Sequence, residues 1–168
     1  IFVGDVRNLR LLPALHTSVE LFQAADTAAR DQVWRRVQNR IAADAELLLD
    51  PSWFHKLVDG DSGITQVETL LKRGEHHNEL TRFRYDVLLT VGEPAASVAP
   101  EDWVAWDELG GLEALQERIE RAGGCLGVTG IPNARVAPAV RANAMLADRS
   151  AVGHAGSVVE ASSAGESM

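Results

Sequence analysis

A turn near the middle of the chain carries several side chains that could do chemistry. Within residues 73–87 these side chains include His76, His77, Asn78, Glu79 and Arg82. A histidine or a carboxylate can accept a proton near neutral pH, and an amide or a guanidinium can orient a polar substrate. This turn is therefore the first candidate for an active site.

Two segments that favour β-strands position the turn. Residues 64–72 and 82–91 are rich in β-branched and apolar side chains, which strands prefer. The connection at residues 74–78 is short enough for a hairpin, so we expect antiparallel pairing. Because side chains of a strand alternate between its faces, Phe83, Tyr85, Val87 and Leu89 would share one face, and Arg82, Arg84 and Asp86 the other.

Structural roles would also explain these side chains. Histidines on a turn are often exposed loop residues, and Tyr85 could belong to the core. Arg82 and Arg84 could form a solvated face or pair with Glu68 across the hairpin. Both interpretations stay open at this level.

The flanking sequence predicts the elements around the hairpin. Periodicity and capping residues predict a buried strand at 1–6, helices at 9–21, 28–45 and 112–119, a short helix starting at residues 50–51, and a strand at 125–129. Alanine, glycine and serine dominate residues 150–168, which predicts a mobile tail.

Composition excludes several classes of function. The 168 residues carry a net charge of -8, which argues against nonspecific binding of nucleic acid. Cys125 is the single cysteine, and the scattered histidines lack partners at ligand spacing, so no disulfide framework and no metal site are expected. No apolar run approaches the ~20 residues that span a bilayer, so we expect no membrane contact and a cytoplasmic location.

The turn belongs to a longer motif. Residues 78–88, Asn-Glu-Leu-Thr-Arg-Phe-Arg-Tyr-Asp-Val-Leu, resemble the motif Asn-Glu-Leu-Ser-x-Tyr-Arg-Tyr-x-Ala-Val of the S-adenosylmethionine-dependent methyltransferase domains embedded in nonribosomal peptide synthetases. Thr81 stands in place of the serine and Phe83 in place of the first tyrosine. Other stretches resemble this family in the same order along the chain: residues 1–9, 46–54 and 130–136.

The resemblance implies an α/β fold, the C-terminal part of a Rossmann-like class I methyltransferase. Residues 1–6, 64–72 and 82–91 would be strands five, six and seven, with strand seven in the middle. Residues 1–91 would form the acceptor-side half of the domain, 92–149 a helical and strand extension, and 150–168 the tail. Ligands of such sheets bind beyond the carboxyl ends of the parallel strands. The loop after residue 4 and the turn would lie there, about 10 Å apart.

The resemblance also implies an activity, namely methyl transfer from S-adenosylmethionine to an aminoacyl or peptidyl thioester. Nitrogen is the favoured acceptor atom, and oxygen and carbon stay open. The partners would be a phosphopantetheine carrier protein and an adenylation domain. The implied catalytic residues are His77 and Glu79, which would accept the proton, and Tyr85, which would orient the amine. The implied substrate-binding residues are Asp5, Arg7, His76, Asn78 and Arg82.

One part of the family pattern is absent from this sequence. The Gly-x-Gly-x-Gly loop that holds the cofactor in this family has no counterpart here, so the cofactor-binding residues stay unassigned. Because the chain begins at Ile1, inside a predicted strand, we expect a longer protein whose N-terminal half of the domain carries that loop. The alternative is a noncatalytic interaction or docking module of a synthetase.

Overall fold

The structure is a computed structural model that describes residues 1–58, 60–93, 99–100 and 102–164. The chain divides into two compact units, Ile1–Glu93 with Ala134–Met168, and Pro94–Asn133. The sequence predicts one extension over residues 92–149, whereas residues 134 onward belong to the first unit, where helix α7 (Ala137–Ala147) packs on helix α1 (Leu12–Gln23).

The first unit contains a four-stranded sheet in the order β2-β1-β4-β3. Its strands are β1 (Phe2–Asn8), β2 (Leu48–Leu49), β3 (Ile64–Leu71) and β4 (Arg84–Val91). Strand β4 pairs antiparallel with both neighbours, and β2 pairs parallel with the end of β1. The predicted antiparallel pairing is confirmed, and β4 lies between β1 and β3 as expected.

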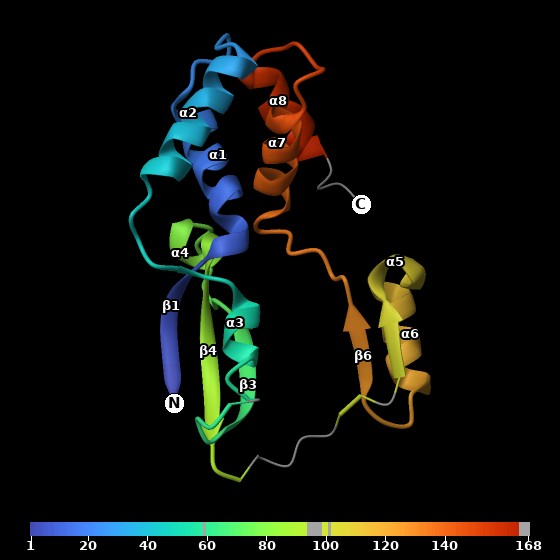
Figure 1. Cartoon of the computed structure of the whole chain (residues 1–168). Coiled ribbons are helices and arrows are strands. Elements are labelled where there is room, and N and C mark those ends of the chain that lie inside the picture. The colour runs from blue at the N-terminus through green and yellow to red at the C-terminus, as the bar shows by residue number, and fades with distance from the viewer. Residues whose placement is uncertain (59, 94–98, 101, 165–168) are drawn as a thin grey trace. The chain divides into compact units, whose positions relative to one another are not determined.

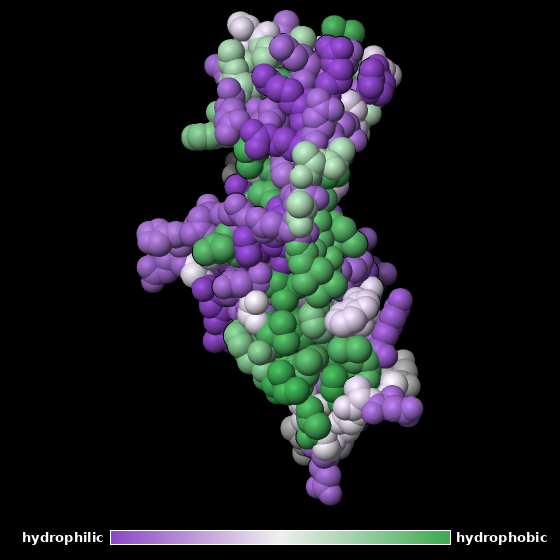
Figure 2. Space-filling view, turned by 60° about the vertical axis from the view of Figure 1, so that its left-hand side comes forward, coloured by the Kyte–Doolittle hydropathy of each residue, from purple (hydrophilic) through white to green (hydrophobic). Residues whose placement is uncertain are grey.

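Alternation along β4 separates a buried face from an exposed one. Tyr85, Val87 and Leu89 form a core with Phe54 of the short helix α3 (Pro51–His55). On the opposite face, Phe2 is 62% exposed and Leu88 is 38% exposed. Figure 2 shows apolar surface gathered over the sheet, next to the more hydrophilic surface of the helices. This sheet is therefore packed on one side.

Helices lie beyond the end of the sheet where β1 ends and β4 begins (Figure 1). A single 3-10 turn, Leu9–Leu11, leads from β1 into α1 (Leu12–Gln23), which packs against α2 (Arg30–Ala43) and α7 (Ala137–Ala147). The predicted helices at 9–21 and 28–45 are confirmed, with shifted ends. Val33 and Val37 of α2 are fully buried in the core of this layer.

Residues 155–163, which composition predicts to be part of a mobile tail, form α8 (Ala155–Ser163). Ala155 and Val158 are each 1% exposed and pack in the same core as Val33. Small side chains allow this close packing, and alanine is the best helix former. Residues 165–168 of the predicted tail lie outside the described part of the chain.

A helix also replaces the tight connection predicted before β4. Helix α4 (Glu79–Phe83) occupies residues that the sequence assigns partly to the strand, so the predicted strand start at residue 82 is wrong. The backbone N–H of Thr81 donates to the side chain of Asn78 at 3.1 Å, and the N–H of Asn78 donates to Thr81 Oγ1 at 3.1 Å. This reciprocal capping box favours a helix start.

The second unit is a small β-α-β arrangement. Its strands β5 (Asp102–Ala105) and β6 (Leu126–Thr129) pair in parallel, and α5 (Trp106–Leu109) and α6 (Leu112–Arg121) connect them. The predicted helix at 112–119 and strand at 125–129 are confirmed. Gly127 lies under the ring of Trp103, where any Cβ would clash. Residues 94–98, near the start of the predicted extension at 92–149, lie outside the described part of the chain.

No helix in the described part of the chain has the length and apolarity required to cross a membrane.

Candidate functional site

The connection that carries the predicted site lies between β3 and β4 and contains α4. His76 and His77 are exposed, and the carboxylate of Glu79 is half exposed. Asn78 uses its side-chain oxygen to cap the helix. The turn therefore exposes two imidazoles just before a short, capped helix and one carboxylate on its first residue.

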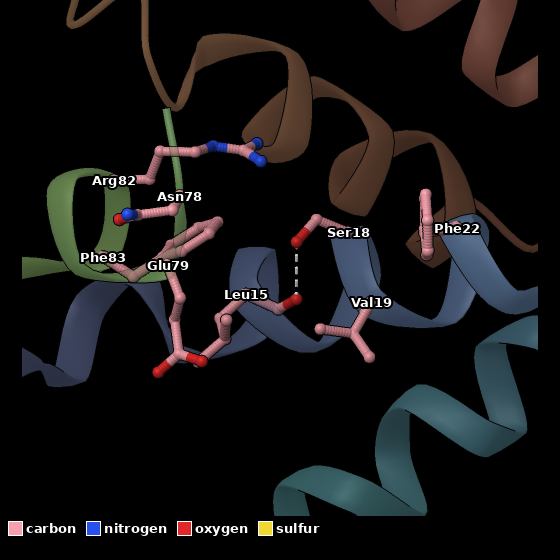
Figure 3. Close-up of a pocket in the computed structure, with 8 residues that line it drawn as sticks. All are labelled: Leu15, Ser18, Val19, Phe22, Asn78, Glu79, Arg82 and Phe83. Atoms are coloured by element: carbon pink, nitrogen blue, oxygen red, sulfur yellow. Dashed lines mark hydrogen bonds between the residues drawn. The ribbon is translucent and has the colours of Figure 1, made fainter. Parts of the chain in front are cut away.

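A groove of about 450 Å³ lies between α4 and α1. Figure 3 shows its lining residues, which are Leu15, Ser18, Val19, Phe22, Asn78, Glu79, Arg82 and Phe83. Three predicted site residues, Asn78, Glu79 and Arg82, are thus brought together with one face of α1. His77 lines a separate hollow that also includes Arg82, and His76 lines neither.

Arg82 is held in place from one side. Its Nε donates to the carbonyl oxygen of Arg135 at 2.9 Å, and its Cζ lies 4.9 Å from the centre of the Phe83 ring. Burial lowers the pKa of the Arg82 guanidinium from its ordinary value, because a low-dielectric environment disfavours the charged form. The side chain is therefore a partly desolvated cation between the groove and α7.

Tyr85 lies away from the other candidates. It is 2% exposed, and its hydroxyl donates to the carbonyl oxygen of Leu49 at 3.0 Å. Burial raises the pKa of this phenol to about 12. The structure thus gives Tyr85 the core position that the sequence left open, with its hydroxyl already engaged.

Asp5 lies at an irregularity in β1. The pairing with β4 shifts between Val3 and Val6, and Asp5 has φ +58°, a left-handed conformation that aspartate tolerates better than most residues. Lys72 Nζ lies 2.7 Å from the Asp5 carboxylate and 2.9 Å from that of Asp86. Hydrogen bonds to Asp5 and then Asp86 raise the pKa of Lys72. Asp5 therefore faces solvent as part of an ion-pair cluster.

Arg7 is buried in a second ion-pair cluster. Its guanidinium donates two hydrogen bonds to Asp44, at 2.8 and 3.0 Å, and the two side chains are only 8% and 7% exposed. Hydrogen bonding from Arg7 holds the pKa of the Asp44 carboxyl well below its usual range. His16 Nε2 lies 2.8 Å from the same carboxylate. Arg7 is thus engaged inside the protein.

A chain of charges links this cluster to the turn. Glu46 lies 3.3 Å from Arg7 and 3.7 Å from Arg84, and Arg84 lies 3.3 Å from Glu79. Two predicted residues from distant segments, Arg7 and Glu79, therefore belong to one network. Sequence reasoning missed His16, Asp44 and Lys72. Only Lys72 had a local signal, its place at the end of a predicted strand.

Gly4 at β1 and Gly74 in the turn do not allow a ligand to approach their backbone closely. A Cβ added at Gly4 would lie 2.8 Å from the ring of Phe2, and one at Gly74 would lie 2.8 Å from the methyl group of Thr81. Both glycines therefore serve internal packing, which leaves no room for a ligand against their backbone. Within the described residues, no group of three or more histidine, cysteine or acidic side chains could hold a metal ion.

No protein-family profile matches this chain. It is 39% identical over 157 residues to chondramide synthase cmdD of Chondromyces crocatus. The aligned region covers 89% of this chain and 4% of that protein. It is 33% identical over 152 residues to the probable non-canonical nonribosomal peptide synthetase CymA of Salinispora arenicola, covering 90% of this chain and 2% of that protein.

A third relative is fungal. The chain is 33% identical over 107 residues to cyclosporin synthetase simA of Tolypocladium inflatum, covering 62% of this chain and 1% of that protein. The chain thus spans 4% or less of the length of these three relatives. Its homologues are nonribosomal peptide synthetases, and it is similar to a small segment of them.

Proposed function

We propose that this chain is the acceptor-side half of a methyltransferase domain that acts in nonribosomal peptide biosynthesis. It would help to transfer a methyl group from S-adenosylmethionine to the amine of a carrier-tethered aminoacyl or peptidyl thioester. The carrier protein and an adenylation domain would be its partners within a synthetase. Oxygen or carbon as the acceptor atom is the closest variant of this proposal.

One observation carries the proposal: the motif at residues 78–88 opens onto a groove at the end of a sheet whose antiparallel strand lies between two parallel ones. Strand β4 begins at this edge, and β1 and β3 end there. Asn78 and Glu79 of the motif line the groove beside α1. Ligands of α/β sheets bind beyond the carboxyl ends of parallel strands. The similarity to nonribosomal peptide synthetases supports the biosynthetic setting.

The acceptor amine must lose a proton before it can be methylated. A model α-amino group has a pKa of about 7.7–8, so a modest base is sufficient. The half-exposed carboxylate of Glu79 would take one proton from the ammonium, which leaves a neutral amine with a free lone pair. His77 is the second candidate for this step, from the neighbouring hollow.

The acceptor would be oriented by side chains whose hydrogen-bond donors are not already used within the protein. The side-chain oxygen of Asn78 is engaged in the helix cap, whereas its NH₂ group can donate to a carbonyl of the substrate. Tyr85 takes no part in this proposal because its hydroxyl is buried and donates to Leu49. Alignment contributes much of such a rate enhancement, so loss of one proton acceptor should impair the reaction only in part.

A noncatalytic docking module is the second candidate. The exposed apolar face of the sheet, including Phe2 and Leu88, and the lack of a Gly-x-Gly-x-Gly loop in this sequence favour it. The two functions differ in one property, since only a methyltransferase domain binds S-adenosylmethionine.

The acceptor-side roles are tested in a longer protein that carries this chain together with its cofactor-binding residues and a loaded carrier. Glu79→Gln should lower kcat by about 100-fold, the lower end of the range of general-base catalysis, with a smaller effect at high pH where the amine is already neutral. Tandem mass spectrometry of the product identifies the methylated atom. Unchanged kcat in both Glu79→Gln and His77→Ala would exclude these residues as the base.

A further inference from the structure

Arg82 lies where three hollows of the first unit meet. It lines the groove beside α4, of about 450 Å³, a second hollow of about 320 Å³ between α1, α7 and α8, and a third of about 350 Å³ next to His77. The first two hollows also share Ser18 and Phe22. We name these two adjoining hollows together the Arg82 groove, because Arg82 lines both of them.

The guanidinium of Arg82 has unused donors in this groove. Its Nε donates to the Arg135 carbonyl, and neither Nη atom has a hydrogen-bond partner within the described residues. No described carboxylate forms an ion pair with Arg82. Glu79, which lines the same groove, is paired with Arg84. In Figure 3 the Arg82 guanidinium and the Glu79 carboxylate point to different sides of the groove.

A partly desolvated cation to which no described residue supplies an anionic partner is unusual. Placing a charge in a poorly solvated environment is costly unless it is paired. The chain carries an excess of acidic residues, with a net charge of -8, and yet none of the described acids neutralises Arg82. Charge complementarity therefore favours an anionic ligand for Arg82.

The walls of the Arg82 groove are mainly apolar. Phe22 is 91% exposed although it is a large aromatic residue at the end of α1. The remaining apolar side chains along the groove are Leu15, Val19, Leu21, Ala24, Phe83, Pro138, Ala139, Ala142 and Val159. Two acids, Glu79 and Asp26, also line it, and neither forms an ion pair with Arg82 within the described residues. Each hollow has a volume in the range of small-molecule sites. The ligand that fits has an apolar stem as well as an anionic group.

We propose that the Arg82 groove binds a small organic anion in which an oxyanion, a phosphate ester or a carboxylate, is attached to a linear apolar stem. The two Nη atoms would donate side by side to two oxygens of the anion, the geometry that arginine favours for both groups. The stem would lie against Phe22 and Val159. A neutral ligand would leave the cation unpaired.

Calorimetric titration of the whole 168-residue chain tests this proposal without any methyl donor. The probes are hexyl phosphate and hexanoate, which carry the two oxyanions. The controls are hexanol, which has the apolar stem without the anion, and inorganic phosphate, which has an anion without the stem. At least one amphipathic anion should bind about tenfold or more tightly than hexanol, the effect of a charge-assisted hydrogen bond. The probe that binds more tightly, hexyl phosphate or hexanoate, identifies the preferred oxyanion. Equal affinity for hexanol, equal affinity for inorganic phosphate, or no binding of either anion would overturn the proposal.

Two substitutions locate the site. Arg82→Gln should weaken binding of the stronger anion about tenfold or more, and Arg82→Lys, which keeps the charge, should lose less. Phe22→Ala removes an exposed ring, so it should weaken binding with no change in thermal unfolding. The control is Arg35→Gln, an exposed arginine on α2 that lines none of the described hollows. Equal affinities in Arg82→Gln and Arg35→Gln would overturn the assignment, and they would leave the methyl-transfer proposal untouched.

Discussion

Asp44 accepts a hydrogen bond from each Nη atom of Arg7, at 2.8 and 3.0 Å. This pair connects the C-terminal end of α2 to the first strand of the sheet. The same carboxylate lies 2.8 Å from His16 on α1. One acid therefore joins three elements at the edge of the sheet where the candidate site lies. A bidentate, largely buried pair of this kind restricts the position of Arg7 much more than a surface ion pair would.

Substitution Asp44→Asn should destabilise the chain strongly. It leaves the buried guanidinium of Arg7 without its carboxylate, a change that costs about 2 kcal/mol or more of unfolding free energy. Urea unfolding followed by circular dichroism measures it. The control is Glu46→Gln, because Glu46 also pairs with Arg7 but is 64% exposed, and it should change stability by less than about 0.5 kcal/mol. Equal effects of the two substitutions would contradict the role of Asp44.

The same pair makes stability depend on pH. The pKa of Asp44 is lowered in the folded chain by hydrogen bonds from Arg7, so the unfolded chain binds the proton first as the pH falls. This stabilisation is fully present above about pH 5 and is lost below the ordinary pKa of about 3.9. The difference in unfolding free energy between wild type and Asp44→Asn should therefore shrink towards about pH 3. If the difference in unfolding free energy stays constant between about pH 5 and about pH 3, Asp44 is not the source of the pH dependence.

The capping box makes α4 sensitive to Asn78. Substitution Asn78→Ala removes the acceptor for the N–H of Thr81 and should cost about 1 kcal/mol. Amide hydrogen exchange should speed up at Thr81 and Arg82, while the strands stay protected. The neighbouring His77→Ala is the matched control, since His77 has no part in the cap. Unchanged exchange in Asn78→Ala would mean that the box does not hold the helix.

Tyr85 can be tested directly because it is the single tyrosine of the chain. Burial raises the pKa of its phenol to about 12. Absorbance of tyrosinate should therefore have its midpoint near pH 12 in the folded chain and near the ordinary value of about 10 in urea. Far-UV circular dichroism at each pH checks that the fold persists. A midpoint near 10 in the folded chain would place the hydroxyl in solvent, contrary to its bond with Leu49.

Local patterns predicted most of the elements. The apolar alternation of β4 correctly separated Tyr85, Val87 and Leu89 from the polar face, because strand periodicity depends only on neighbours in the sequence. Helix α4 was missed although its signal was present, since Asn78 and Thr81 have the spacing of a capping box. The strand-like residues that follow outweighed that signal.

The ion-pair clusters could not be predicted in the same way. Arg7 and Asp44 are 37 positions apart, and their contact depends on how α2 returns to the sheet. The sequence also assigned His16 no partner, because its carboxylate comes from a different element. The position of Arg82 between the hollows depends on α7 and α8, and composition predicts that α8 belongs to a mobile tail.

The most direct test of the central claim is calorimetric titration of S-adenosylmethionine into two proteins. One is this chain, and the other is the same chain extended upstream along its own coding sequence through the first glycine-rich loop. We predict that the extended protein binds S-adenosylmethionine and that this chain alone does not, because its sequence lacks the Gly-x-Gly-x-Gly loop that holds the cofactor in the family it resembles. An extended protein that does not bind S-adenosylmethionine would contradict the assignment to a methyltransferase domain.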